Sequence, residues 1–85
     1  MSYQVEWLRS AVRELNALPV QVAIRIGETV GRLAQEPRPH GCKKLVGHKD
    51  LWRIRIGSYR VIYFIGDAVK LVRIEKVSDR KDAYR

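Results

Sequence analysis

Apolar and polar residues alternate most clearly over residues 51–65, which read Leu-Trp-Arg-Ile-Arg-Ile-Gly-Ser-Tyr-Arg-Val-Ile-Tyr-Phe-Ile. A period of two is typical of a β-strand with one buried face, and the pair Gly57-Ser58 interrupts it near the middle. The pattern therefore predicts a β-hairpin with these two residues as its turn. In that register Arg55 lies opposite Arg60. The other predicted pairs are Ile56 with Tyr59 and Ile54 with Val61.

The two faces of the predicted hairpin differ in chemistry. One face is apolar and aromatic and is expected to enter the core; it carries Trp52, Ile54, Ile56, Tyr59, Val61 and Tyr63. The other face carries Arg53, Arg55 and Arg60. Like charges directly opposite each other destabilise a sheet. A hairpin that keeps Arg55 against Arg60 is therefore suited to bind an anion.

The N-terminal part of the chain has a helical period instead. Apolar residues with i, i+3, i+4, i+7 spacing predict an amphipathic helix; they are Leu8, Ala11, Val12, Leu15 and Leu18. Pro19 ends this helix and is predicted to be the first residue of a second helix, which runs to about Gln35. The predicted buried side of that helix carries Val20, Ala23, Ile24, Gly27, Val30 and Ala34, with Ile26 and Leu33 beside it. Gly27 and Gly31 are predicted to allow close packing.

Three further strands complete the predicted fold. Residues 2–6 form a first strand, residues 44–46 a short one, and residues 68–77 a last one after a turn at Gly66-Asp67. If that turn has two residues, Arg60 lies opposite Arg73 and the row of arginines crosses three strands. The resulting order is β-α-α-β-β-β over one domain, residues 1–85. It predicts an α+β fold with two layers, in which two N-terminal helices pack on one face of a mostly antiparallel sheet.

Charge is concentrated in the middle of the chain. The net charge is +8, and residues 38–60 hold seven basic residues and one acidic residue, a net of +6. Such a local excess indicates a polyanionic partner, either nucleic acid or an acidic protein, although a basic face that serves only solubility is the alternative. The predicted arginine face also contains Ile62, Phe64, Val69 and Leu71. A partner is expected to cover these apolar side chains.

The sequence argues against several other classes of protein. No apolar run approaches the ~20 residues that cross a bilayer, and the N-terminus lacks the pattern of a signal peptide. The single cysteine, Cys42, has no neighbours at metal-ligand spacing. We therefore expect a cytoplasmic protein with no metal and no cofactor. His40 and His48 lie in the basic loop and are expected to be loop residues near a phosphate, with an acid–base pair as the less favoured alternative.

At the hairpin the chain resembles the RelE/ParE superfamily of toxin–antitoxin toxins, and RelE-type mRNA interferases in particular. The resemblance rests on residues 45–47 (Leu-Val-Gly), residues 51–63 and residues 77–84 (Val-Ser-Asp-Arg-Lys-Asp-Ala-Tyr), and it covers nearly the whole chain. It implies metal-independent, ribosome-dependent cleavage of mRNA in the A site, with a 2′,3′-cyclic phosphate as product. It also implies a small RelB-like antitoxin as the partner.

The resemblance also assigns site residues by position. Arg53 and Arg55 match two basic strand residues of RelE toxins, and Arg60 matches the arginine of the Gly-x-Tyr-Arg motif. Arg80 and Tyr84 match the arginine after the last strand and the C-terminal tyrosine. The best-known member has lysines in place of Arg53 and Arg55, and its arginine-to-tyrosine spacing is longer. Because arginine rarely gives up a proton, these departures favour a mechanism of charge stabilisation and positioning.

The individual roles follow from that mechanism. We expect the three hairpin arginines to hold the scissile phosphate, Arg80 to face the leaving oxygen, and Tyr84 to stack on a base or orient the 2′-OH. Contacts with ribosomal RNA phosphates are expected for Lys43, Lys44 and Lys49. Two alternatives remain open. ParE-type members share much of the hairpin motif and inhibit DNA gyrase without catalysis. The chain could also be a binding module for RNA or an acidic partner that is harmless alone.

Overall fold

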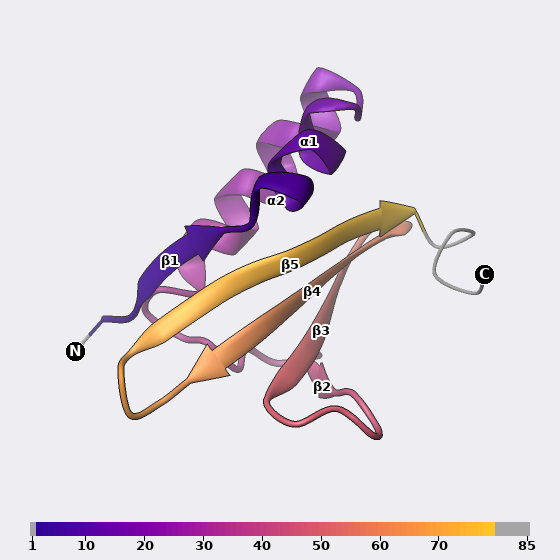
Figure 1. Cartoon of the computed structure of the whole chain (residues 1–85). Helices are drawn as coiled ribbons and strands as arrows, with labels where there is room; N and C mark the ends of the chain where they lie inside the picture. Colours follow the sequence, from indigo (N-terminus) through magenta and orange to yellow (C-terminus); the bar gives the residue numbers. More distant parts are fainter. Residues whose placement is uncertain (1, 80–85) are drawn as a thin grey trace.

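The structure is a computed structural model and describes residues 2–79 (Figure 1). Its elements follow the predicted order, with two helices between a first strand and four later ones. They are β1 (Gln4–Trp7), α1 (Arg9–Asn16), α2 (Val20–Arg32), β2 (Lys43–Lys44), β3 (Leu51–Ile56), β4 (Tyr59–Gly66) and β5 (Leu71–Asp79). The helices are somewhat shorter than predicted, and Pro19 immediately precedes α2 instead of opening it. The short strand β2 lies slightly before its predicted position.

The five strands form one mixed sheet in the order β1-β5-β4-β3-β2. The pair β1–β5 is parallel, and the other three pairs are antiparallel. Both helices lie on the same side of this sheet (Figure 1). The prediction of a two-layer α+β fold is therefore confirmed. Neither helix in residues 2–79 is long and apolar enough to cross a membrane.

The core lies between the helices and the inner face of the sheet. The hairpin contributes Ile54, Ile56, Val61 and Tyr63 to it, as the alternation predicts. Trp52 and Tyr59 pack against its edge. The Tyr63 hydroxyl donates a 2.8 Å hydrogen bond to the Pro37 carbonyl oxygen, and burial raises the pKa of this phenol. These aromatic side chains therefore hold the domain together, and the arginine face lies on the other side of the sheet.

The buried side of α2 differs in part from the prediction, which is right for Val30 but wrong for Val20 and Ile24. Ile26, Val30 and Leu33 are almost fully buried, whereas Val20 is 71% and Ile24 53% exposed. The helix has two apolar stripes, and the one that packs on the core also includes the partly buried Val22. A Cβ atom on Gly27 or Gly31 would meet nothing within 4 Å. The predicted close packing at these glycines is therefore wrong for the described chain.

The last strand also differs from the prediction. It begins at Leu71, not at Ala68, because the connection after Gly66 is a turn of four residues, 67–70, and not of two. Lys70 adopts a left-handed conformation at φ 53°. A glycine at this position would have indicated such a conformation, but a lysine does not. A bulge between Ile62 and Tyr63 then shifts the register of β4 against β5 once more.

Candidate phosphate-binding site

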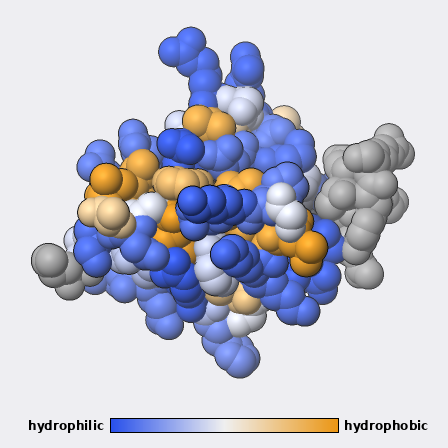
Figure 2. Space-filling view, turned by 60° about the horizontal axis from the view of Figure 1, so that its bottom comes forward, coloured by the Kyte–Doolittle hydropathy of each residue, from blue (hydrophilic) through white to orange (hydrophobic). Residues whose placement is uncertain are grey.

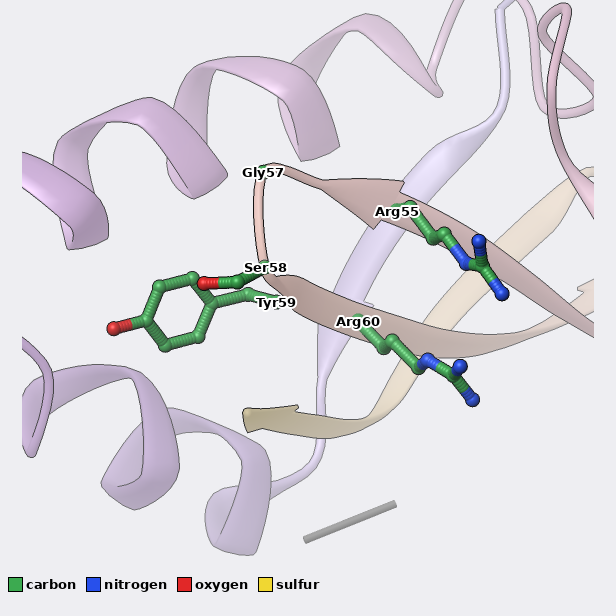
Figure 3. Close-up of a pocket in the computed structure, with 5 residues that line it drawn as sticks. All are labelled: Arg55, Gly57, Ser58, Tyr59 and Arg60. Carbon is green, nitrogen blue, oxygen red and sulfur yellow. The ribbon is translucent and has the colours of Figure 1, made fainter. Parts of the chain in front are cut away.

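The hairpin of β3 and β4 has the predicted register. Arg55 is the cross-strand partner of Arg60, and the turn consists of Gly57 and Ser58. Gly57 has φ +62°, a left-handed conformation, whereas Ser58 does not have a positive φ; this is the pattern of a type II′ turn with glycine first. The turn therefore places both arginines on one face. In Figure 3 their side chains extend to the same side of the hairpin, whereas Tyr59 points the other way.

A pocket of about 260 Å³ lies at this end of the hairpin (Figure 3). Its lining consists of Arg55, Gly57, Ser58, Tyr59 and Arg60. The two arginines differ in environment, because Arg55 is exposed and Arg60 is only 9% exposed. A largely buried guanidinium is held in one place by its surroundings, so it can offer its donors to an anion without much loss of side-chain entropy.

Arg53 lies two residues before Arg55 on the same face. Its cross-strand neighbours are Ile62 on β4 and Lys43 on β2. Directly opposite residues of a sheet share a face, so Lys43 belongs to the arginine face, whereas Lys44 pairs with Trp52 and belongs to the opposite one. The sequence alone does not distinguish these two lysines, whereas the register of β2 places them on different faces. Lys49 is exposed in the loop that follows.

Arg73 does not extend the row of arginines. The longer turn and the bulge place Ser78 opposite Arg60, whereas Arg73 lies opposite Phe64. Its Nε donates a 2.8 Å hydrogen bond to Glu75 Oε2, and its guanidinium carbon lies 4.7 Å from the centre of the Phe64 ring. The predicted pairing of Arg60 with Arg73 is therefore wrong, and Arg73 covers an aromatic side chain on the outer face.

Ser78 is the residue that the sequence analysis missed at this point. It is 7% exposed, and its Oγ makes no hydrogen bond within the described chain. Buried hydroxyls almost always have a partner, so one without a partner calls for an explanation and is often found at a functional site. The row across three strands is therefore Arg55, Arg60 and Ser78. The remaining predicted residues, Arg80 and Tyr84, lie outside the described residues.

Three of the four predicted apolar side chains lie on the arginine face, whereas Val69 lies in a turn. Ile62, Phe64 and Leu71 are partly buried, and Val69 in the turn before β5 is 70% exposed. On the side of the molecule shown in Figure 2, hydrophobic side chains in orange gather in patches among hydrophilic side chains in blue. By the strand register, partly buried apolar side chains alternate with the arginines on the outer face of the sheet, so a partner would meet both charge and apolar area there.

A second cluster of charges has a structural role. Asp67 accepts hydrogen bonds from Arg38 Nη2 at 2.8 Å, Arg38 Nη1 at 3.1 Å and the Tyr3 hydroxyl at 2.6 Å. The bonds from Arg38, followed by the one from Tyr3, lower the pKa of Asp67 from 3.8 to about 2. Arg38 also lies 4.9 Å from the centre of the Trp52 ring. Arg38 therefore fastens its loop to the sheet, although by charge alone it looks like a phosphate contact.

One further arginine lies beside the hairpin turn. A Cβ atom on Gly57 would lie 3.5 Å from Arg25 Nη1, so the side chain of this α2 residue reaches the turn. The sequence gives no reason to place Arg25, a helix residue, beside a hairpin turn about thirty residues later. The histidines are both exposed, and no group of three His, Cys, Asp or Glu side chains in residues 2–79 is placed to hold a metal ion. The described site thus offers fixed positive charge and hydrogen-bond donors.

The sequence of this chain is similar to those of known toxins. A model of the family described as the ParE toxin of the type II toxin-antitoxin system parDE matches residues 5–84. The chain is 30% identical to the putative toxin RelE1 of Methanocaldococcus jannaschii over 88 residues, which span 100% of this chain and 98% of that protein. It is 34% identical to the toxin RelG of Mycobacterium tuberculosis over 89 residues, 100% of this chain and 99% of the other.

Solved structures show the same fold. An archaeal RelE–RelB complex from Pyrococcus horikoshii matches with a TM-score of 0.83 and 35% identity, covering 94% of this chain and 97% of that one. The toxin–antitoxin complex RelBE2 of Mycobacterium tuberculosis matches with a TM-score of 0.81 and 30% identity, covering 94% and 100%. With the family match over most of the sequence, these likenesses show that the chain belongs to the RelE/ParE superfamily and is a RelE-like toxin of a type II toxin–antitoxin system.

Proposed function

We propose that this toxin is a metal-independent endoribonuclease that cuts mRNA in the A site of the ribosome and so stops translation. The observation that carries the proposal is the pair Arg55 and Arg60, set opposite each other at a pocket with Arg60 largely buried. The opposition of two like charges costs stability in the free protein, and a bound phosphate would remove that cost. Ribosomes and mRNA are in the cytoplasm, so the proposal also places the toxin there.

The proposed reaction uses the RNA's own 2′-OH. The 2′-oxygen attacks the adjacent phosphorus, its proton leaves, and the bond from phosphorus to the 5′-oxygen breaks as that oxygen gains a proton. The products are a 2′,3′-cyclic phosphate and a free 5′-OH. The negative charge on the phosphate oxygens increases towards the transition state, so fixed guanidinium groups stabilise that state more than the bound substrate.

The residues divide this work in the proposal. Arg55 and Arg60 bind the scissile phosphate, and Arg53 binds the RNA backbone next to it. Arg80 faces the leaving 5′-oxygen and Tyr84 the base or the 2′-OH, by their match to the RelE motif. The ribosome supplies the geometry of the substrate, which explains how a site without an evident acid–base pair among its described residues could still accelerate cleavage.

The test is cleavage of mRNA on purified, programmed ribosomes, with the cut mapped by primer extension. We expect cuts within the A-site codon, and a loss of about 10²–10³ in rate for Arg60→Ala. Arg9→Ala, which removes an exposed arginine from α1, is the control and should cut as the wild type does. Full activity of Arg60→Ala and Arg80→Ala at the same codons would contradict the site assignment.

A second candidate is inhibition of DNA gyrase, favoured by the match to the ParE family description. In this case the arginine face would contact gyrase or DNA and no bond would break. A supercoiling assay with purified gyrase distinguishes the two. Inhibition of gyrase together with intact mRNA would replace the ribonuclease proposal.

We also propose that a RelB-like antitoxin is the cognate partner. The support comes from the relatives, whose solved structures are RelE–RelB complexes, and from the exposed apolar side chains of this chain. Val20, Ile24 and Val69 are more than half exposed, and a net charge of +8 favours an acidic partner. Co-expression of the neighbouring small open reading frame, followed by co-purification and loss of toxicity, tests this pairing.

A further inference from the structure

The end of strand β5 lacks a neighbouring strand on one side. The pairing of β1 with β5 covers Leu71 to Ile74, and β1 ends there at Trp7, whereas β5 continues to Asp79. Within the described sheet β1 is the sole neighbour of β5 on this side, because the other side is paired with β4. Backbone donors beyond Ile74 on this edge therefore need a partner of another kind.

Glu14 of α1 supplies that partner. Its Oε1 accepts a 2.8 Å hydrogen bond from the backbone N–H of Val77, and its Oε2 accepts one from Lys76 Nζ at 3.3 Å. The contact with Val77 is part-buried, and the Val77 side chain itself is 3% exposed in the core. The Glu14 carboxylate thus accepts a hydrogen bond that a neighbouring strand would otherwise accept. It links α1 to the C-terminal end of β5.

The tied segment is the part of β5 that borders the arginine face. Ser78 follows Val77 directly and lies opposite Arg60. Arg60 and Ser78 are the polar side chains with the lowest exposure in the described chain, at 9% and 7%. Arg80 follows two residues later in the sequence. The position of this strand end therefore determines where Ser78 lies relative to Arg60.

We propose that Glu14 is a positioning residue of the RNA-cleaving site. It touches neither substrate nor the reacting atoms. Its carboxylate fixes the end of β5, so that Ser78 is held opposite Arg60. The inference rests on the proposed function for its catalytic part, whereas the hold on β5 can be measured without any activity.

The experiment compares three variants with a control matched for stability. Glu14→Ala removes the acceptor, Glu14→Gln keeps an oxygen for the Val77 N–H but loses the charge, and Lys76→Ala removes only the second contact. Ile26→Val is the control, since it weakens the core and leaves both contacts of Glu14 in place. Each variant is assayed for kcat and KM on programmed ribosomes and, by hydrogen exchange, for protection of the Val77 amide.

We expect Glu14→Ala to lower kcat by about 10- to 100-fold, since small displacements of catalytic groups have effects of this size. KM should change little, and the Val77 amide should exchange at least about tenfold faster, because the bond that protects it is gone. Glu14→Gln should keep most of the wild-type kcat and most of the protection of the Val77 amide. Lys76→Ala and Ile26→Val should keep the wild-type kcat.

Two outcomes would overturn the inference. One is an unchanged kcat in Glu14→Ala, or a fall no larger than in Ile26→Val at equal stability. The other is unchanged protection of the Val77 amide, which would show that Glu14 does not hold the strand. If Glu14→Ala fails to fold, a Glu14→Gln variant as slow as Arg60→Ala, with the Val77 amide still protected, also overturns it. Absence of cleavage by the wild type would instead refute the proposed function, and the exchange measurement would still decide whether Glu14 holds β5.

Discussion

Arg55 on β3 lies directly opposite Arg60 on β4, with both guanidinium groups on the same side of the hairpin (Figure 3). Two cations that lie opposite each other repel, so replacing one of them should stabilise the sheet. The pair is therefore expected to serve function at the expense of stability, a common trade-off at binding sites.

Replacing Arg55 should make the protein more stable and less active. We expect the free energy of unfolding to rise from wild type to Arg55→Gln, which removes the repulsion, and again to Arg55→Glu, which adds an attraction. The total gain should be several tenths to about 1 kcal/mol, the size of a cross-strand pair. Urea denaturation measures the series, and cleavage on ribosomes should fall in the same order. A loss of stability in both variants would contradict the repulsion.

Asp67 should make stability depend on pH below about 4. Its pKa is about 2 in the folded protein and 3.8 without the bonds from Arg38 and Tyr3, so the folded state favours the charged carboxylate. The stabilisation is therefore complete above pH 4 and is lost as the pH falls towards 2. Asp67→Asn should be less stable than wild type at pH 6, and the difference should shrink as the pH approaches 2.

The measurement is the urea midpoint at pH 6, 4, 3 and 2.5. Tyr3→Phe is the matched control, because it removes one hydrogen bond to Asp67 and leaves the two from Arg38. Its pH dependence should lie between those of wild type and Asp67→Asn. Parallel pH curves for wild type and Asp67→Asn would show that Asp67 does not make stability pH-dependent.

Two isoleucines of α2, two residues apart, should lose very different amounts of stability on truncation. Ile26 is fully buried, so Ile26→Ala should cost about 2–5 kcal/mol. Ile24 is 53% exposed, and Ile24→Ala should change the unfolding free energy by less than about 0.5 kcal/mol. Thermal or urea unfolding of the two variants decides between the observed face of α2 and the one that the sequence pattern suggested. Equal losses would contradict the observed orientation.

The strand registers could be predicted from the sequence only where a local signal, such as a turn glycine, determines them. The hairpin register was predictable because a turn of two residues, opened by Gly57, fixes which residues oppose each other. The register of β5 was not, because Lys70 adopts a positive φ without being glycine and the bulge beyond Ile62 leaves no mark in the alternation. Together, the longer turn and the bulge place Ser78, and not Arg73, opposite Arg60.

Long-range contacts were beyond the reach of sequence pattern. Arg38 and Asp67 are 29 residues apart, and Glu14 and Val77 are 63 apart. In the sequence Arg38 is only one of the seven basic residues in the middle of the chain, whereas in the structure its contacts with Asp67 and Trp52 fasten its loop. The face of α2 was ambiguous for another reason, since the helix has two apolar stripes and only the tertiary fold decides which one is buried.

Lys43 should matter more for RNA binding than Lys44, although the two are adjacent and both are exposed. Lys43 lies opposite Arg53 on the arginine face, whereas Lys44 lies opposite Trp52 on the other. A lost phosphate contact with single-stranded RNA reduces the slope of log affinity against log salt by about 0.7. We therefore expect this reduction, with weaker ribosome binding, for Lys43→Ala. Lys44→Ala should keep nearly the wild-type slope, and equal effects would mean that the register of β2 does not determine which lysine meets the RNA.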